Sequence, residues 1–220
     1  MSERWATFDC YGTLIDWPGG IRAQLARLWP GNDADALLRT YHQIEPRIQE
    51  GRGIPYRQVM AETLAGVAEA EGLSIPDGEA DALATSLPSW KVFPEVPGSL
   101  TELRDRGWNL AILSNTDADL LDASLTTIGV PVDRRVVASE VGSYKPAFGH
   151  WETFFRESGA ERTRHIHVAA SLFHDIEPAA KLGLPAVWIN RLGETSMVPR
   201  SAELPDLAQL PDTLDRLVPA

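Results

Sequence analysis

Short apolar runs alternate with segments of helical period along most of this chain, and this alternation limits the fold more than any other feature. The apolar runs are RWATFD at 4–9, NLAILSN at 109–115, RRVVASEV ending near Glu140, HIHVAAS at 165–171 and PAVWINR at 185–191. Strands separated by helices of this length predict a parallel, doubly wound sheet. We therefore expect an α/β fold whose core is a Rossmann-like doubly wound parallel sheet.

A helical stretch separates the first apolar run from the others. Apolar residues such as Ile21, Leu25 and Leu28 recur there at intervals of three and four, and no segment between 15 and 90 alternates like a strand. Asp33 is placed to cap one of these helices. The sequence therefore predicts a core domain made of residues 1–14 and 91–220, with an inserted helical cap domain at residues 15–90.

The composition excludes several classes of protein. The 220 residues carry 20 basic and 31 acidic side chains, a formal charge of −11, and no run of basic residues that could bind nucleic acid. No apolar stretch approaches the ~18 residues of a membrane span, and no apolar leader segment follows the N-terminus. The single cysteine, Cys10, excludes an intrachain disulfide. We expect a cytoplasmic protein that binds neither nucleic acid nor a membrane.

Polar side chains follow four of the expected strands. Because the carboxyl ends of parallel strands meet at one edge of the sheet, we expect these side chains to share a crevice. A carboxylate at position 9 beside the ammonium of Lys145 would stay ionised and fixed in direction, which suits a nucleophile. The alternative is ordinary: strands end in polar loops, and an aspartate there can simply cap a turn. The residues concerned are Asp9, Ser114 with Asn115, Lys145, and Asp175 after Ser171.

Four segments resemble the four motifs of the haloacid dehalogenase superfamily, in the same order. They are FDCYGTLIDW at 8–17, LSN at 113–115, SYKP at 143–146 and SLFHD at 171–175. The first motif, SYKP and the WINR sequence at 188–191 are similar to the 2-haloacid dehalogenase branch. The resemblance covers essentially the whole chain. It implies a hydrolase that acts on a small anionic organic acid through an aspartyl ester, and a homodimer.

The resemblance also implies a role for each matching residue. Asp9 is the expected nucleophile, with Thr13, Ser114 and Lys145 holding its carboxylate and that of the substrate. Asp175 is expected to orient Lys145 and the hydrolytic water. Arg39 is expected to receive the leaving halide, although it could equally be a solvated charge on a helix. Further residues expected around the substrate or halide are Asn115, Tyr56, Trp17, Ser171, Cys10 and Tyr11 beside the nucleophile, and Trp151, which replaces a tyrosine of the dehalogenases.

Metal-dependent chemistry is disfavoured by the same motifs. Phosphatases of the superfamily carry a second Asp where this chain has Tyr11, and a further acid where it has Ala170, which leaves too little charge for Mg²⁺. His165 and His167 share one face of a strand, but no third ligand is near them in sequence. The phosphonate-cleaving branch needs a lysine in the cap, and residues 14–90 contain none. We therefore expect no metal and no cofactor.

Two other hypotheses remain open. The segments SLFHD and FDCYGTLIDW are also similar to azetidine-2-carboxylate hydrolase, in which the leaving group is a ring amine. His174 beside Asp175 could donate a proton there, or could be an ordinary loop residue. In the fourth motif Ala170 and Leu172 stand where the dehalogenases have Ser and Asn, so a degenerate protein that binds a small carboxylate without turnover is the second hypothesis.

Overall fold

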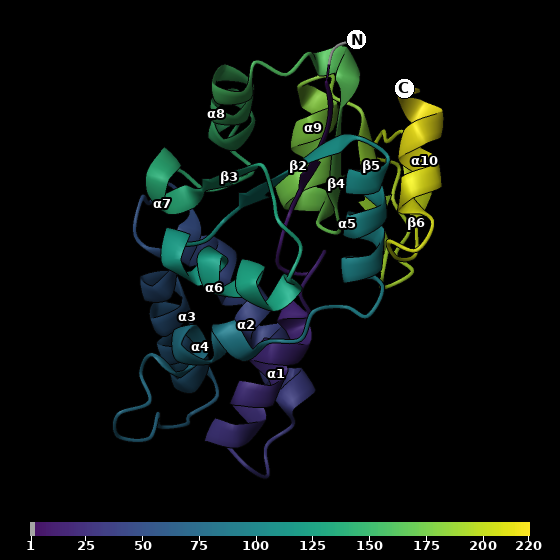
Figure 1. Ribbon diagram of the computed structural model, residues 1–220. Helices are drawn as coiled ribbons and strands as arrows, with labels where there is room; N and C mark the ends of the chain where they lie inside the picture. Colours follow the sequence, from purple (N-terminus) through teal and green to yellow (C-terminus); the bar gives the residue numbers. More distant parts are fainter. Residues whose placement is uncertain (1–2) are drawn as a thin grey trace.

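The computed structural model describes residues 3–220, and in this part of the chain six parallel strands form one sheet (Figure 1). Their order is β3-β2-β1-β4-β5-β6, so β1 lies between β2 and β4. The expected doubly wound α/β fold is confirmed. The strands are β1 (Arg4–Phe8), β2 (Trp108–Ser114), β3 (Arg134–Val137), β4 (His165–Ala169), β5 (Ala186–Ile189) and β6 (Ala202–Leu204).

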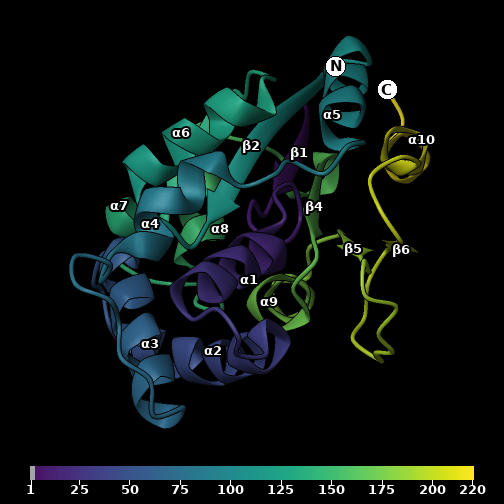
Figure 2. The same cartoon turned by 90° about the horizontal axis from the view of Figure 1, so that it is seen from below.

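Successive strand residues enter different apolar clusters, one on each face of the sheet. Ala6 and Phe8 of β1 belong to the larger cluster, whereas Trp5 of the same strand belongs to the smaller one. This is the two-residue period of a strand that is buried on both sides. The helices α5 (Val96–Asp105), α6 (Ala118–Ile128) and α10 (Leu210–Leu217) contribute to the first cluster, and α8 (Gly149–Ser158) and α9 (Glu177–Lys181) to the second (Figure 2).

Four α-helices lie between β1 and α5. They are α1 (Trp17–Leu28), α2 (Ala34–Gln49), α3 (Tyr56–Ala70) and α4 (Ala82–Ser86), and they form the lower part of Figure 1. Asp33 caps α2 as expected, because its carboxylate accepts hydrogen bonds from the amides of Asp35 and Ala36. Capping of this kind contributes about 1 kcal/mol to a helix.

The two chain segments that connect these helices to the sheet run side by side. Ile15 and Val92 form an antiparallel bridge. The amide of Asp16 donates to Lys91 O at 2.8 Å, and the amide of Phe93 donates to Leu14 O at 3.0 Å. The outgoing and returning segments are therefore held together by backbone hydrogen bonds just below the sheet.

Two local elements differ from the sequence prediction. The strand expected to end near Glu140 ends at Val137, because the next four residues form the short helix α7 (Ala138–Val141), closed by Gly142 at φ 77°. Beyond Ser171 the chain makes a wide π-helical turn, Leu172–Ile176, before α9 begins. The three-residue edge strand β6 is too short to show a period in the sequence.

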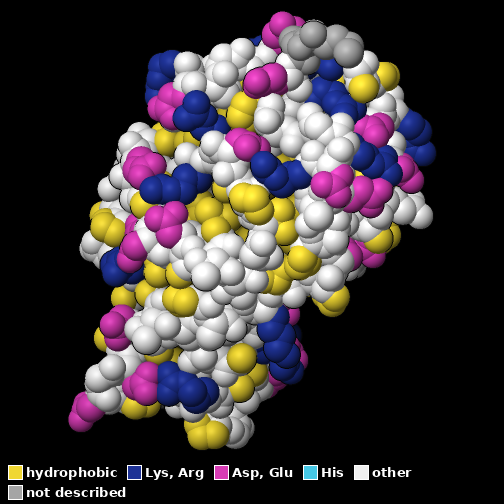
Figure 3. All heavy atoms as spheres, in the orientation of Figure 1, with side chains coloured by type: hydrophobic (Ala, Val, Ile, Leu, Met, Phe, Trp, Pro, Cys, Tyr) yellow, Lys and Arg dark blue, Asp and Glu magenta, His cyan; other side chains and the backbone are white. Residues whose placement is uncertain are grey.

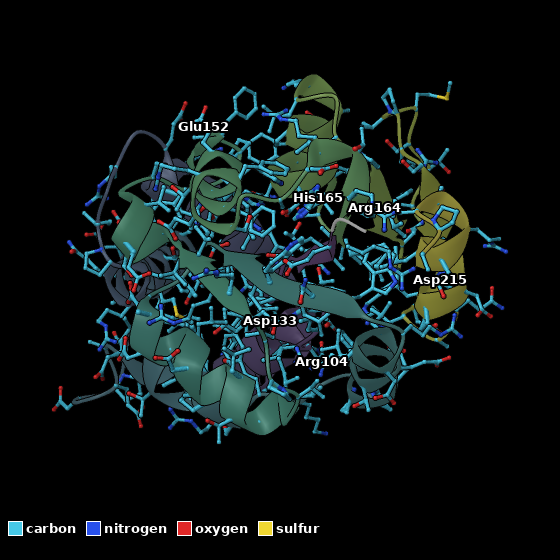
Figure 4. The ribbon with its side chains drawn as sticks, turned by 45° about the horizontal axis from the view of Figure 1, so that its top comes forward. Arg104, Asp133, Glu152, Arg164, His165 and Asp215 are labelled. Carbon is cyan, nitrogen blue, oxygen red and sulfur yellow. The ribbon has the colours of Figure 1, made fainter. Side chains whose placement is uncertain are left out.

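Charged side chains of both signs are interspersed over the face seen in Figure 3. One ion-pair group fixes the last helix: Asp215 of α10 (Figure 4) accepts hydrogen bonds from Arg4 at 2.7 Å and from the indole of Trp108 at 2.9 Å. Another pair in the same view joins Arg104 and Asp133 at 2.8 Å. Within residues 3–220, no helix is long and apolar enough to cross a membrane.

Candidate active site

A cleft of about 650 Å³ lies between the carboxyl ends of the central strands and the helices α1–α3. This is the edge of an open α/β sheet where ligands bind. The strand side and its loops contribute Asp9, Tyr11, Ser114, Asn115, Lys145, Ser171, His174 and Asp175. The helix side contributes Asp16, Trp17, His42, Glu45, Gln49 and Tyr56.

Asp9 directly follows β1, and its carboxylate is held at both oxygens. The amide of Asp9 donates to Val168 O at 3.1 Å, which continues the pairing of β1 with β4. Lys145 Nζ donates to Oδ1 at 2.9 Å, and Thr13 Oγ1 donates to Oδ2 at 3.0 Å. Gly12, at φ 92°, allows the tight turn that brings Thr13 back to the carboxylate. Asp9 is therefore fixed in direction while it faces the cleft.

Lys145 uses all three of its ammonium protons inside the protein. Nζ donates to Asp9 Oδ1, to Asp175 Oδ1 at 2.7 Å and to Leu113 O at 2.8 Å. Its backbone is held as well, since the amide of Lys145 donates to Asn115 Oδ1 at 2.7 Å and Asn115 Nδ2 donates to Lys145 O at 2.9 Å. The side-chain amide of Asn115 therefore positions Lys145.

The cluster is electrostatically coupled. Burial raises the pKa of Asp9, and Lys145 and Thr13 oppose this rise. Burial alone would lower the pKa of Lys145, but Asp175 and Asp9 raise it above its ordinary value. Burial likewise opposes ionisation of Asp175, yet Lys145 and His167 bring its pKa well below its usual range. The ammonium is therefore maintained between two carboxylates in a site shielded from water.

Two hydroxyl groups complete the strand side. Ser114 lines the cleft, and its buried Oγ makes no hydrogen bond within residues 3–220. Ser171 Oγ accepts a hydrogen bond from the amide of His174 at 3.1 Å. Burial lowers the pKa of His174 to about 4, so this imidazole is neutral near pH 7 and cannot act as an imidazolium acid.

The helix side is aromatic and carries one buried carboxyl group. Trp17 Nε1 donates to Tyr56 Oη at 3.0 Å, and Tyr56 Oη donates to Glu45 Oε1 at 2.9 Å. The ring of His42 stacks on Trp17 with 5.1 Å between centroids. Burial raises the pKa of Glu45 to about 7, an effect that the hydrogen bonds from Tyr56 and Tyr41 reduce. Among the residues that line the cleft, those from α1–α3 include no lysine or arginine.

Sequence reasoning missed Glu45 and His42. Glu45 follows Leu37 and Tyr41 at intervals of four, so it lies on the buried stripe of α2. A glutamate within an apolar stripe was the available signal, because a carboxyl group is rarely buried without a partner.

The structure corrects the expectation for Arg39. Its side chain is 66% exposed, 3.9 Å from Asp33, and it does not line the cleft. Leu37 and Tyr41 of α2 are buried. Position 39 is two residues, or about 200°, around the helix from position 37, so it points to solvent.

Two other residues named around the substrate do not line the cleft with their side chains. Cys10 is completely buried in the larger apolar cluster, since strand alternation turns it away from the cleft. Trp151 is completely buried in the smaller cluster, and it packs edge-on against His167 at 5.3 Å instead of reaching the substrate. Tyr11 lines the cleft, but its hydroxyl is bound to Ser124 Oγ at 2.9 Å.

The donor set does not fit a Mg²⁺ ion between the two carboxylates. Lys145 Nζ already bonds both Asp9 and Asp175, so a second cation at that place would be repelled. Within the described part of the chain, no group of three or more His, Cys, Asp or Glu side chains is placed to hold a metal. The chemistry of the site is that of an oriented carboxylate.

Comparisons with known proteins agree with this architecture. The model of the haloacid dehalogenase-like hydrolases matches residues 4–183. The chain is 31% identical to an (S)-2-haloacid dehalogenase of Pseudomonas sp. (strain YL), over 84% of this chain and 82% of that protein. It is 30% identical to haloacetate dehalogenase H-2 of Moraxella sp. (strain B), over 84% and 85% of the two chains.

A solved L-2-haloacid dehalogenase superposes with a TM-score of 0.87 at 24% identity, over 98% of this chain and all of that one. Another from Xanthobacter autotrophicus, with chloropropionic acid covalently bound, has a TM-score of 0.83 at 19% identity, over 96% and 97% of the two chains. The molecule is thus a hydrolase with an α/β fold. It belongs to the haloacid dehalogenase-like hydrolase family.

Proposed function

We propose that this protein is a metal-independent 2-haloacid dehalogenase. The observation that carries the proposal is the carboxylate of Asp9, held at one oxygen by Lys145 and at the other by Thr13 while it faces the cleft. An oriented carboxylate beside an ammonium is the equipment that displacement at a saturated carbon requires. The (S)-2-haloacid dehalogenases among its relatives support the same reaction.

The first step forms an ester. A carboxylate oxygen of Asp9 attacks C2 of the haloacid, the carbon–halogen bond breaks, and its electron pair leaves with the halide. Ser114 Oγ, buried in the cleft without a partner in residues 3–220, is available to donate to the carboxylate of the substrate. Because Lys145 holds Asp9 in one direction, little reorganisation is needed before attack.

The second step hydrolyses the ester. A water oxygen adds to Cγ of Asp9, and one water proton passes to Asp175. The bond between Cγ and the ester oxygen then breaks, and the departing alkoxide takes the remaining proton to become a 2-hydroxy acid. Asp9 returns to a carboxylate, and Asp175 releases its proton to solvent. Asp175 lines the cleft and bonds Lys145 at 2.7 Å, which places it beside the ester.

The helical residues 15–90 act in this proposal as a cap over the cleft. Cap movement admits the acid, and closure excludes water from the first step. We propose that the enzyme acts in the cytoplasm without a cofactor and, as the resemblance implies, as a homodimer.

The test is halide release from racemic 2-chloropropionate and from fluoroacetate, with EDTA present. Wild-type protein should release halide, and Asp9→Asn should release none. After a rapid acid quench, a substrate adduct on Asp9 should appear in the mass spectrum of the wild type. A wild type that binds the acid but gives neither halide nor adduct would instead be the degenerate carboxylate binder.

A second candidate function is ring opening of the azetidine-2-carboxylate type. It is favoured by Glu45, a buried carboxyl group on the helix side of the cleft, and by the position of Arg39 in solvent. A carboxyl group stabilises a departing amine by charge or by proton transfer, whereas a halide would prefer a cation. Asp9 would attack C2, the bond from C2 to nitrogen would break, and hydrolysis would give 4-amino-2-hydroxybutyrate.

The two candidates are separated by comparing turnover of 2-chloropropionate and azetidine-2-carboxylate in the same preparation. Glu45→Gln should lower ring opening about tenfold or more, the effect of losing one interaction with a charged group. The same variant should keep halide release. Glu69→Gln, an exposed change on α3, is the matched control for both substrates.

A further inference from the structure

Three polar side chains are completely buried between the sheet and α8, outside the cleft. They are Thr7 of β1 and His165 and His167 of β4, each at 0% exposure. The parallel register pairs Thr7 with His167, and it pairs Trp5 of the same face with His165. Their surroundings are aromatic, since Trp151 packs on His167, and Phe154 and Phe155 pack on His165. Figure 4 shows His165 in this interior, between the sheet and the helices.

These side chains form one line of hydrogen bonds that ends at the active site. His165 Nε2 lies 2.8 Å from Thr7 Oγ1, and Thr7 Oγ1 lies 2.8 Å from His167 Nδ1. His167 Nε2 lies 2.9 Å from Asp175 Oδ1, the oxygen that also accepts from Lys145. Apolar side chains would fill this space with less desolvation cost, so a continuous line of hydrogen-bonded polar side chains here points to a role beyond packing.

The direction of the line follows from its two ends. Asp175 is ionised and can only accept, so Nε2 of His167 carries a proton, and in a neutral ring Nδ1 is then the acceptor. His167 Nδ1 then accepts from the Thr7 hydroxyl, which accepts from the Nε2 proton of His165. Burial lowers the pKa of His165 well below its usual range, so this ring is neutral. Nδ1 of His165 is then an unprotonated acceptor without a partner in residues 3–220. If every hydrogen bond of the line ran the other way, a buried N–H would be left without a partner at this atom instead.

The line matters most once Asp9 has become an ester. In the free enzyme two donors, Lys145 and His167, converge on Oδ1 of Asp175, and the buried Oδ2 makes no hydrogen bond within residues 3–220. Esterification removes the negative charge of Asp9. Lys145 then has only one anionic partner, Asp175, so its electrostatic attractions to the two carboxyl groups are no longer balanced. His167 does not touch Asp9 and keeps its bond, so it becomes the constant restraint on Asp175.

We propose that His167 is a positioning residue for hydrolysis of the Asp9 ester, with Thr7 and His165 fixing its tautomer. It holds Oδ1 of Asp175 so that Oδ2 stays directed to the water that adds to Cγ of Asp9 and accepts one proton from it. The electron and proton balance is that of the second step described above. This inference rests on the proposed function only in requiring an Asp9 ester.

The test separates the two chemical steps in single-turnover experiments with 2-chloropropionate and acid-quench mass spectrometry. His167→Leu should form the Asp9 ester within about threefold of the wild-type rate but hydrolyse it about tenfold more slowly, as expected for one lost hydrogen bond to a charged group. The ester should therefore accumulate. His167→Gln, whose side-chain N–H can reach Asp175, should restore hydrolysis towards the wild-type rate. A residue that only fills space would slow both steps alike and would not be rescued by Gln.

A second measurement needs no substitution at His167. Long-range proton–nitrogen spectra of protein labelled at the histidine nitrogens should show His167 as the Nε2–H tautomer in the wild type and in Thr7→Ser, but not in Thr7→Val. Equal slowing of both steps in His167→Leu, or an Nδ1–H tautomer in the wild type, would overturn the inference. A wild type that turns over without ever forming an adduct on Asp9 would overturn the proposed function instead, and with it the step in which His167 acts.

Discussion

The two walls of the cleft differ in how they are built. On the strand side, Asp9, Lys145 and Asp175 form a charged cluster in which the lysine has no free donor. On the helix side, Trp17 and Tyr56 form an aromatic wall together with the buried Glu45, and burial raises the pKa of that carboxyl group to about 7. In the proposed reaction the strand wall carries the nucleophile, whereas the helix wall faces the leaving group and can change without disturbing the nucleophile.

The largest effect should come from Lys145→Met, which breaks the strand wall. Two buried carboxylates would then face each other without a cation, so we expect activity to fall at least about a thousandfold. The free energy of unfolding should fall by about 3–5 kcal/mol, the usual cost of leaving a buried charge unpaired. Halide release and urea titration measure these effects. Full activity in the variant would contradict the role of the ammonium. Lys145→Arg keeps the positive charge but not the three hydrogen bonds of Nζ, so it tests the charge alone.

An intermediate effect should come from Glu45→Gln, which tests the helix wall through its pH dependence. A folded-state pKa raised from 4.5 to about 7 means that the fold favours the uncharged acid. This contribution is fully present below pH 4.5 and is lost as the pH rises through 7. The wild type should therefore lose roughly 3 kcal/mol of unfolding free energy between pH 4.5 and pH 8.5 that the variant does not lose.

Denaturant titrations at the two pH values measure that difference. Glu69→Gln should follow the wild type, because Glu69 is exposed on α3. Parallel curves for all three proteins would mean that Glu45 titrates as an ordinary surface carboxylate.

The smallest effect should come from Arg39→Ala, on the outer face of the same helix. Its side chain is 66% exposed with a single distant ion pair, so stability should change by less than about 0.5 kcal/mol. Halide release should stay within about twofold of the wild type. A large loss of kcat would show that α2 turns Arg39 into the cleft during the reaction, and that the helix wall is cationic when it acts.

The sheet and the strand wall could be predicted because both follow from local pattern. Apolar runs separated by helices predict a parallel, doubly wound sheet, and polar residues at the strand ends fall together by topology. Asp9, Lys145 and Asp175 could be placed in one crevice for that reason. What pattern could not supply is which oxygen bonds which donor, or that the side chain of Asn115 is occupied by the backbone of Lys145.

Only part of the helix wall could be predicted: Trp17 and Tyr56 were named from the sequence and line the cleft, whereas the places of Glu45 and Arg39 depend on the rotation of α2 about its own axis. The distance along the chain from Asp9 to Arg39 does not set that rotation; the burial of Leu37, Tyr41 and Glu45 does. The line from His165 to Asp175 was also out of reach. The sequence showed two histidines on one strand face without a third metal ligand nearby, and only the register with Thr7 shows that they are hydrogen-bonded to its hydroxyl.

The paired segments below the sheet have a mechanical consequence. Because Ile15 and Val92 are bridged, the helices α1–α4 are joined to the sheet along one line, which permits swinging but resists sliding or lifting. A second attachment lies on α3: the amides of Tyr56 and Arg57 donate to the carboxylate of Asp117 at 2.8 and 3.1 Å. The bridge between Ile15 and Val92 is therefore placed to act as a hinge for these helices, and the hydrogen bonds to Asp117 hold them against the core at a second point. If the helices swing open as proposed, the hydrogen bonds to Asp117 must break, so a contact outside the reacting atoms contributes to the barrier to opening.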